Sequence, residues 1–308
     1  MFEIIFLGTS ASAPSIQRGL SAQIVKHDEY RFLVDCGEGT QRQILKSGLG
    51  FKRLNRILLT HGHLDHILGL GGLISTLMRW EALDTLEIFG SPRTLERVHD
   101  LLYGVVLRGE KPQGKLSLRE IQPGVIFETK KFTVSAFSVS HRGAGCLGYK
   151  FEEKSHRPFL ADKADALDIP FGPLRGDLVR EKSVTLPDGR RIDPESVLGA
   201  CVDGASLAIT GDTGKTQNLL EVCKGVDTLV CEATYTEEDA KMARKFGHLT
   251  ARQAGELAKQ AGVTRLVLTH LSRRYRERDI RREARAVFPN SEVARDFDIY
   301  KIKRKKNE

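Results

Sequence analysis

Short apolar runs with the alternation or β-branched content of strands recur along the chain, and amphipathic stretches with helical spacing separate many of them. The runs predict strands at 2–7, 21–25, 31–34, 56–59, 86–89, 132–138, 207–209, 228–231 and 266–269. Helical spacing predicts helices at 40–47, 68–79, 94–103, 216–223, 236–246, 250–261 and 274–287. Because strands outnumber those of a simple βα array, we expect an α/β protein with partly antiparallel sheets covered by helices.

One long stretch, residues 151–198, lacks this pattern. It contains five prolines, eight Lys and Arg against ten Asp and Glu, and only short apolar clusters. Nearly fifty residues of this kind are too long for an ordinary loop, and their apolar clusters are too short for an independent core. We therefore expect one domain over 1–308 that carries an inserted, protruding arm at 151–198. The basic tail at 301–308 is expected to fray.

The composition is that of a soluble globular protein, with 40% hydrophobic and 29% charged residues among 308. The longest apolar run, 67–80, is broken by three glycines and is too short to span a membrane. The first residues read as a strand rather than a secretory signal, so we expect a cytoplasmic protein with no membrane partner. The five cysteines are scattered without a C-x-x-C pair and are expected to be buried thiols.

The formal net charge of +8 favours polyanionic partners, and arginine is concentrated in one segment. Between Ser272 and Arg285 there are seven arginines against three acidic residues. One interpretation is a solvated helix face with i,i+4 pairs such as Glu277 with Arg281. The other interpretation is a segment that binds phosphate. The residues next to the segment distinguish these two interpretations.

The strongest chemical signal is Thr60-His61-Gly62-His63-Leu64-Asp65-His66, directly after an apolar strand. His61 and His63 alternate onto one side, and Asp65 and His66 follow in a turn, so these ligand types converge. Imidazole and carboxylate without thiolate favour a catalytic metal site over a closed structural one. Further ligand candidates each end another predicted strand, namely His141, Asp212 and His270. Taken singly, each of these could instead be a loop or turn residue.

With these motifs the sequence resembles the metallo-β-lactamase superfamily and, within it, the ribonuclease Z family. The resemblance extends over nearly the whole chain. It is carried by F-L-G-T-S-A-S-A-P-S (6–15), V-D-C-G-E-G-T-Q (34–41), T-H-G-H-L-D-H (60–66), I-P-F-G-P-L-R-G (169–176), L-P-D-G-R-R-I (186–192), T-G-D-T (210–213), C-E-A-T-Y (231–235), G-H-L-T (247–250) and L-T-H-L-S-R-R-Y (268–275).

This resemblance implies an αββα sandwich with an inserted arm and two zinc ions, although the same ligand types also accept manganese or iron. The first ion would be held by His61, His63 and His141, and the second by Asp65, His66 and His270, with Asp212 bridging them. The implied catalytic residues are Asp65, which orients the nucleophile, His248 as general acid, and Glu232, which holds the His248 ring.

The resemblance also implies RNA contacts. Arg273, Arg274 and Tyr275 directly follow the ligand His270, which favours the phosphate-binding interpretation of the arginine-rich segment. Arg18 would contact the tRNA end, and Gly172 with Pro173 would contact tRNA from the arm. The loop Pro14-Ser15-Ile16-Gln17-Arg18-Gly19 keeps only Pro14 and Arg18 of the family pattern P-x-K-x-R-N. Because of this departure, the sequence predicts neither the position of the cut relative to the discriminator base nor whether a CCA end blocks cleavage.

The expected activity is that of a zinc-dependent hydrolase, an endoribonuclease that removes 3′ trailers from precursor tRNA and leaves a 3′-hydroxyl. The resemblance further implies a homodimer. The alternative is a small-molecule phosphodiesterase of the cyclic-nucleotide type, for which the 151–198 arm would have no use. A metal-binding RNA-interaction protein without turnover, or a thioester or lactam hydrolase, fits the residues less well. The arm itself could instead brace a dimer.

Overall fold

The chain folds into two compact units, which we describe separately. The structure is a computed structural model that describes residues 1–81, 84–112 and 114–304. The main unit contains residues 1–152 and those from Ala205 onward, and the inserted unit is Glu153–Gly204. The inserted unit overlaps the expected arm at 151–198.

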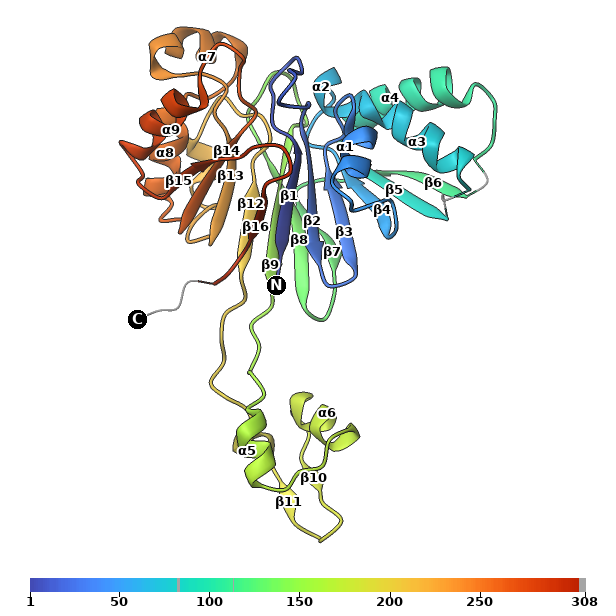
Figure 1. The fold of residues 1–308 in the computed structure, drawn as a ribbon, viewed down its shortest axis with the longest axis vertical. Coiled ribbons are helices and arrows are strands. Elements are labelled where there is room, and N and C mark those ends of the chain that lie inside the picture. Colours follow the sequence, from blue (N-terminus) through green and yellow to red (C-terminus); the bar gives the residue numbers. More distant parts are fainter. Residues whose placement is uncertain (82–83, 113, 305–308) are drawn as a thin grey trace. The chain divides into compact units, whose positions relative to one another are not determined.

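The main unit contains two sheets, and the first has the strand order β16-β1-β2-β3-β4-β5-β6 (Figure 1). Neighbours from β16 to β3 are antiparallel and those from β3 to β6 are parallel. The strands are β1 (Glu3–Gly8), β2 (Ala22–His27), β3 (Tyr30–Val34), β4 (Leu54–Leu58), β5 (Thr85–Gly90), β6 (Lys115–Glu120) and β16 (Ile299–Lys301).

The second sheet has the order β15-β14-β13-β12-β9-β8-β7. Its β12 to β15 side is parallel, whereas β12 with β9 and β7 with β8 are antiparallel. Both sheets are therefore mixed, as the sequence predicts. The strands are β7 (Gly124–Glu128), β8 (Phe132–Ser138), β9 (Leu147–Glu153), β12 (Ser206–Ile209), β13 (Thr228–Glu232), β14 (Arg265–Thr269) and β15 (Ser291–Val293).

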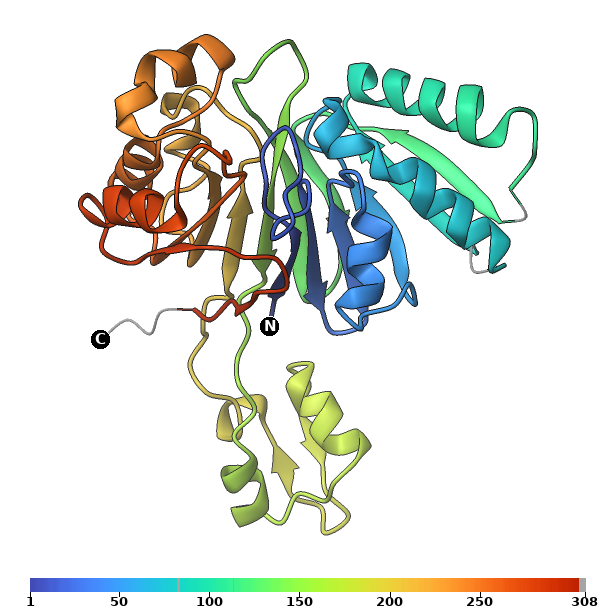
Figure 2. The same cartoon turned by 45° about the horizontal axis from the view of Figure 1, so that its top comes forward.

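Helices cover the outer faces of the two sheets (Figure 2). Alternation along β1 shows the layering, because Ile4 and Phe6 join the core between the sheets while Ile5 and Leu7 join the core under the helices. Burial on both faces explains why the strands read as continuous apolar runs. The expected αββα sandwich is confirmed. Its helices are α1 (Thr40–Lys46), α2 (Leu64–Ile67), α3 (Gly69–Arg79), α4 (Pro92–His99), the π-helix η1 (Asp100–Leu107), α7 (Ala240–Phe246), α8 (Ala251–Gln260) and α9 (Glu277–Arg285).

Two predictions about the main unit need correction. The helix predicted at 216–223 is wrong, since only the 3-10 turn η3 (Gln217–Leu219) forms there. This segment buries little besides Leu219 and Cys223, and it ends at Gly225, whose φ of 66° is incompatible with a continuing helix. Part of the tail expected to fray belongs to β16, and residues 305–308 lie outside the described residues.

The inserted unit has an apolar core of its own, so the expectation that it would lack one is wrong. It contains α5 (Ala161–Ala166), α6 (Pro173–Val179), the short strands β10 (Val184–Thr185) and β11 (Arg191–Ile192), and the 3-10 turn η2 (Pro194–Ser196). Its buried residues are Ala164, Ile169, Leu178, Val184, Leu186, Ile192 and Val197.

The same unit corrects the prediction that every cysteine is buried, because Cys201 is exposed. Its two chain ends run side by side, with His156 and Val202 joined by a pair of backbone hydrogen bonds of 3.0 and 2.9 Å. The unit is therefore closed at its base and can be excised there without separating the ends of the remaining chain.

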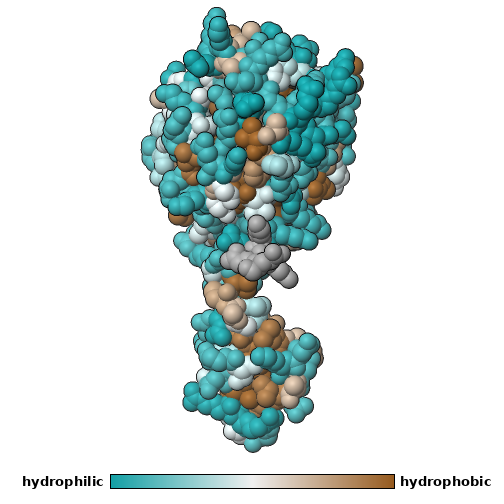
Figure 3. Space-filling view, turned by 90° about the vertical axis from the view of Figure 1, so that its left-hand side faces the viewer, coloured by the Kyte–Doolittle hydropathy of each residue, from teal (hydrophilic) through white to brown (hydrophobic). Residues whose placement is uncertain are grey.

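Hydrophilic residues predominate on the face shown in Figure 3, and apolar residues are scattered among them. Within the described part of the chain, no helix has both the length and the apolar character needed to cross a bilayer.

Candidate metal centre

The first ligand candidates follow β4. Beyond this strand, Thr60 donates its backbone N–H and its hydroxyl to the buried carboxylate of Asp35, at 2.8 and 3.0 Å from Oδ1. His61 comes next, and His63 is the N-cap of α2, so Asp65 and His66 fall in the first turn of that helix. The strand end and the helix start together fold this short motif back on itself.

The other ligand candidates lie at strand ends of the second sheet. His141 follows β8, Asp212 follows β12, and His270 follows β14. Gly211, before Asp212, has a φ of 62°, and a Cβ there would lie 2.9 Å from the Thr60 side chain. His270 itself has a φ of 54°, which is strained for a residue other than glycine. The backbone is thus held in an unfavourable conformation where it presents a ligand.

Three overlapping groups of ligand atoms result, two that contain the predicted ligands and a third in which His248 joins Asp212 and His270. In the first, His61 Nε2 lies 2.9 Å from His63 Nδ1, which lies 3.4 Å from His141 Nε2. In the second, Asp65 Oδ2 lies 3.4 Å from His270 Nε2 and 3.8 Å from His66 Nε2. The ligand atoms within each group lie within 4.8 Å of one another. The structure therefore brings together all the predicted ligands.

Asp212 lies between the two groups. Its Oδ2 is 3.7 Å from His61 Nε2 and 3.4 Å from His66 Nε2, and its Oδ1 is 3.4 Å from His270 Nε2. Asp212 is 3% exposed. One carboxylate thus faces histidines of both groups, which is the arrangement that a bridging ligand requires.

Contacts behind the histidines fix which ring nitrogen faces inward. His66 donates from Nδ1 to Asp35 Oδ2 at 2.7 Å, and His141 donates from Nδ1 to Gly247 O at 2.6 Å. His270 donates from Nδ1 to the Thr234 hydroxyl at 2.9 Å. In each case Nε2 stays available as a ligand atom. Sequence reasoning missed Asp35 and Thr234, although Asp35 follows β3 in the same way that the ligands follow their strands.

The residues present fit divalent cations. His66 Nε2 and Asp212 Oδ1 are buried and make no hydrogen bond within the described part of the chain. Burial alone would lower the pKa of His66, but Asp212 and Asp35 hold it well above its usual range. Burial likewise opposes ionisation of Asp65, but a hydrogen bond from His270 and the charge of His66 lower its pKa. Burial lowers the pKa of His61, His63 and His141, so these rings stay neutral as ligands must, and the carboxylates of the cluster stay ionised.

His248 and Glu232 form a pair beside this cluster. Gly247, with a φ of 70°, ends α7, and Thr250 caps α8, so His248 lies in the short connection between the two helices. Its Nδ1 lies 2.9 Å from Glu232 Oε1. Burial would lower the pKa of His248, but Glu232 raises it to about 9. The ring packs 5.4 Å from that of His270, centroid to centroid.

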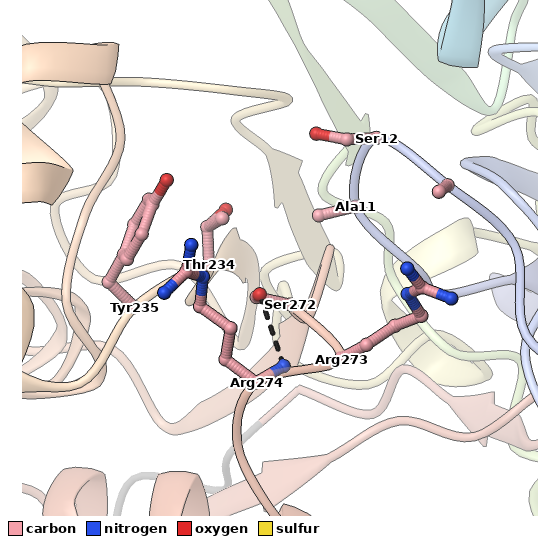
Figure 4. Close-up of a pocket in the computed structure, with 8 residues that line it drawn as sticks. Ala11, Ser12, Thr234, Tyr235, Ser272, Arg273 and Arg274 are labelled. Carbon is pink, nitrogen blue, oxygen red and sulfur yellow. Dashed lines mark hydrogen bonds between the residues drawn. The ribbon is translucent and has the colours of Figure 1, made fainter.

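Two cavities continue from the ligands. One of about 390 Å³ contains His63, Asp65, Asp212 and His248 together with Arg274. The neighbouring cavity, of about 610 Å³, is lined by Arg273 and Arg274 along with Tyr235 and Ser12. Figure 4 shows the Arg274 side chain directed toward Tyr235 and that of Arg273 directed the opposite way. Both predicted arginines therefore lie at the entrance to the ligand cluster.

Arg18 and Tyr275 have partners within the protein and also line a cavity of about 220 Å³ together with Arg273. Arg18 donates to the carbonyl of Ala294 at 2.6 Å and pairs with Glu277 at 3.0 Å. The Tyr275 hydroxyl donates to Asp239. These contacts hold both side chains in place at the cavity, and Arg18 fixes the loop that carries it.

The remaining predicted contact residues, Gly172 and Pro173, lie in the inserted unit. Gly172 precedes α6 with a φ of 122°, a conformation that favours glycine, and Pro173 is the first helical residue. The predicted pair between Glu277 and Arg281 also forms, so the arginine-rich segment contributes both a paired helix face and the cavity arginines.

The fold and this centre define a hydrolase of the metallo-β-lactamase class, in which metal-ligating loops at the strand ends of an αββα sandwich build the site. Two family models match the chain. Residues 166–271 match the beta-lactamase superfamily domain, and residues 2–162 match the model described as anti-Pycsar protein Apyc1.

The chain belongs to the ribonuclease Z family. It is 45% identical to the ribonuclease Z of Bradyrhizobium diazoefficiens, over 97% of this chain and 99% of the relative. It is 39% identical to the ribonuclease Z of Gemmatimonas aurantiaca, over 94% of this chain and 93% of the relative. It is 38% identical to that of Listeria monocytogenes, over 97% of this chain and 99% of the relative. The family predicted from the sequence is confirmed.

Solved structures agree on the fold. The short form of human tRNase Z superposes with a TM-score of 0.69 at 24% identity, over 98% of this chain and 99% of that one. The metallo-β-lactamase fold protein YhfI of Bacillus subtilis gives a TM-score of 0.69 at 18% identity, over 97% and 98%. At these identities the likeness shows the fold alone.

Proposed function

We propose that this protein is a metal-dependent endoribonuclease that removes 3′ trailers from precursor tRNA and leaves a 3′-hydroxyl on the tRNA. The observation that carries the proposal is a complete ligand cluster whose open cavity also contains His248, with the buried Glu232 behind that ring. Membership in the ribonuclease Z family supports the choice of tRNA as substrate.

Two zinc ions per chain are the proposed cofactors. His61, His63 and His141 would hold one ion, and Asp65, His66 and His270 the other, with Asp212 shared. Zinc suits this set of imidazoles and carboxylates, and manganese or iron suits it as well. When bound, paired divalent ions lower the pKa of water and offset the charge that develops on a phosphate under in-line attack.

Side chains of the protein orient the nucleophile and donate the proton that the leaving group needs. Asp65 receives the backbone N–H of Ser12 at 2.9 Å and faces the cavity, where it orients the nucleophile. Glu232 holds Nδ1 of His248 at 2.9 Å, so the opposite nitrogen, Nε2, is free to donate a proton. That proton goes to the departing O3′ of the tRNA, which becomes the hydroxyl of the product.

The inserted unit is the proposed tRNA-binding arm, in which Gly172 and Pro173 contact the folded RNA. Exposed basic residues gather in its second half, at Arg180, Lys182, Arg190 and Arg191, where the three arginines also pair with neighbouring aspartates, whereas Arg175 is buried and pairs with Asp165. Contact with the RNA backbone suits such a surface better than readout of bases. Arg273 and Arg274 would bind phosphates nearer to the cleaved bond. A homodimer, which the family resemblance implies, and a cytoplasmic location belong to the same proposal.

Substrate preference separates this proposal from a small-molecule phosphodiesterase. Zinc-reconstituted protein should be compared on a precursor tRNA with a trailer and on a 3′,5′-cyclic nucleotide, with His63→Ala as the inactive control. We expect kcat/KM to favour the precursor tRNA by at least about 10³, because binding energy from remote parts of a large substrate is used at the reacting bond. A preference for the cyclic nucleotide would contradict the proposal.

A further inference from the structure

A further cavity, of about 270 Å³, adjoins the ligand candidates His61 and His63 and shares no lining residue with the cavity that Arg273 and Arg274 line. His61, His63 and three arginines, Arg93, Arg97 and Arg142, are among its lining residues. It shares His63 and Arg142 with the central cavity, which in turn shares Arg274 and Tyr235 with the entrance cavity. The ligand cluster therefore lies in the middle of a continuous groove that is basic at both ends.

The three arginines of this cavity have no carboxylate partner among the residues that the structure describes. Arg93 makes neither a hydrogen bond nor an ion pair with any described residue. Arg97 donates to the carbonyl of Gly62 at 2.5 Å, and Arg142 lies over the Phe246 ring at 5.1 Å. All three are exposed. In contrast, Arg18 and Arg281 pair with Glu277. The cavity thus concentrates positive charge that the protein does not neutralise.

Glycines make room for these side chains. A Cβ on Gly62 would lie 3.3 Å from Cδ of Arg97, and one on Gly143 would lie 3.3 Å from Nη1 of Arg93. Gly143 also has a φ of 88°, which favours glycine. The arginines therefore lie close against bare backbone beside the ligands His61 and His63, and the cavity between them stays open.

Hydrolysis gives the groove a direction. Because His248 protonates the departing O3′, the tRNA lies on the His248 side of the cleaved bond, toward Arg274 and Tyr235. His248 and Glu232 are not among the residues that line the Arg93 cavity. The phosphate and the RNA that follows it must then leave the centre at the other end of the groove.

We propose that the cavity formed by Arg93, Arg97 and Arg142 binds backbone phosphates of the first trailer nucleotides, on the 3′ side of the cleaved bond. This inference rests on the proposed function and adds the direction in which single-stranded RNA crosses the site. Guanidinium groups suit this task because they bind phosphate through paired hydrogen bonds and do not discriminate between bases. Trailers of different sequence are then held equally well.

The test compares two precursor tRNAs that differ only in trailer length, one with a single trailer nucleotide and one with several. For the wild type, kcat/KM should be higher with the longer trailer. Arg93→Ala should reduce the ratio of kcat/KM for the longer trailer to kcat/KM for the shorter one by about tenfold, as expected for one lost charge-assisted contact. Arg93→Lys should restore much of this ratio. Arg274→Ala should lower both values alike. Arg252→Ala, an exposed arginine on α8 outside all three cavities, is the matched control.

A charge-neutral methylphosphonate at the first phosphate beyond the cleaved one provides a second readout. This substitution should slow cleavage of the longer precursor by the wild type. It should not slow cleavage by Arg93→Ala beyond the rate that this variant shows with the unmodified precursor. Equal losses on both trailers in Arg93→Ala, or a dependence on trailer length that appears in Arg274→Ala instead, would overturn the proposed direction. Failure of the proposed function is distinct, since wild-type protein would then cut neither precursor.

Discussion

Replacing His248 by alanine separates proton transfer from metal binding. His248 is 11% exposed and touches the ligand cluster, but its nearest partner is Glu232 rather than a ligand. In the variant, Glu232 still accepts the backbone N–H of Thr213 at 2.7 Å and the hydroxyl of Thr234 at 2.5 Å. The buried carboxylate therefore stays paired, and the metal ligands keep their supporting contacts.

The size of the effect follows from what is lost. One charge-assisted hydrogen bond disappears, which costs stability of about 1.5–3 kcal/mol. A general acid contributes about 10²–10⁴-fold to rate, so single-turnover cleavage of precursor tRNA should slow by that factor while RNA affinity and metal content stay unchanged. Cleavage of bis(p-nitrophenyl) phosphate should slow far less, because p-nitrophenolate leaves without needing a proton.

The assay therefore follows both substrates with each protein and measures bound metal after dialysis. His99→Ala, an exposed histidine with 62% of its side chain accessible, is the control and should match the wild type. Equal slowing on both substrates would refute the role of general acid. Loss of metal from His248→Ala would make His248 a ligand instead.

Three further predictions address the ligands, the inserted unit and the loop. His63→Ala should lose one metal ion, and Asp212→Ala close to both because it faces both groups; full metal content in either variant would refute the ligand assignment. In a second variant, a short Gly-Ser linker replaces residues 157–201 and joins the chain where His156 pairs with Val202. This variant should keep its metal content and its hydrolysis of bis(p-nitrophenyl) phosphate, but its affinity for precursor tRNA and the salt dependence of that affinity should fall sharply. Unchanged tRNA cleavage would refute the arm's role. Arg18→Ala should destabilise the fold by about 1–2 kcal/mol in denaturant unfolding, since its partly buried ion pair with Glu277 is broken. An unchanged midpoint would show that the contact is dispensable.

The clustering of the ligand candidates was predictable because the 61–66 motif and each of the other candidates follow an apolar strand, and strand ends at one edge of a sheet lie close together. His61, His141, Asp212 and His270 all obey this rule. The fold class followed from the same alternation of strands and helices. Strands β6 and β7 escaped prediction because they are only partly buried, and their apolar pattern is correspondingly weak. Strand β9 was also missed, although it is largely buried, because its seven residues include a glycine and three charged residues.

What the sequence did not reveal depends on contacts between distant residues. Arg18 pairs with Glu277, which is 259 residues away in the chain, so the sequence alone does not reveal that Arg18 fixes its own loop. The core of the inserted unit gathers single apolar residues from Ala164 to Val197, and none of them forms a long apolar run. Arg93 lies on a different helix from every predicted ligand, so only the fold places it beside His61 and His63.

Mapping the ends of the cleavage products tests the central claim most directly. A precursor tRNA with a 3′ trailer, labelled at either end, is incubated with zinc-loaded wild-type protein and with His63→Ala as control. We expect a single cut at the tRNA–trailer junction that leaves a 3′-hydroxyl on the tRNA and a 5′-phosphate on the trailer, with no cut in the control. A 2′,3′-cyclic phosphate on the tRNA, or equal cutting by His63→Ala, would contradict it.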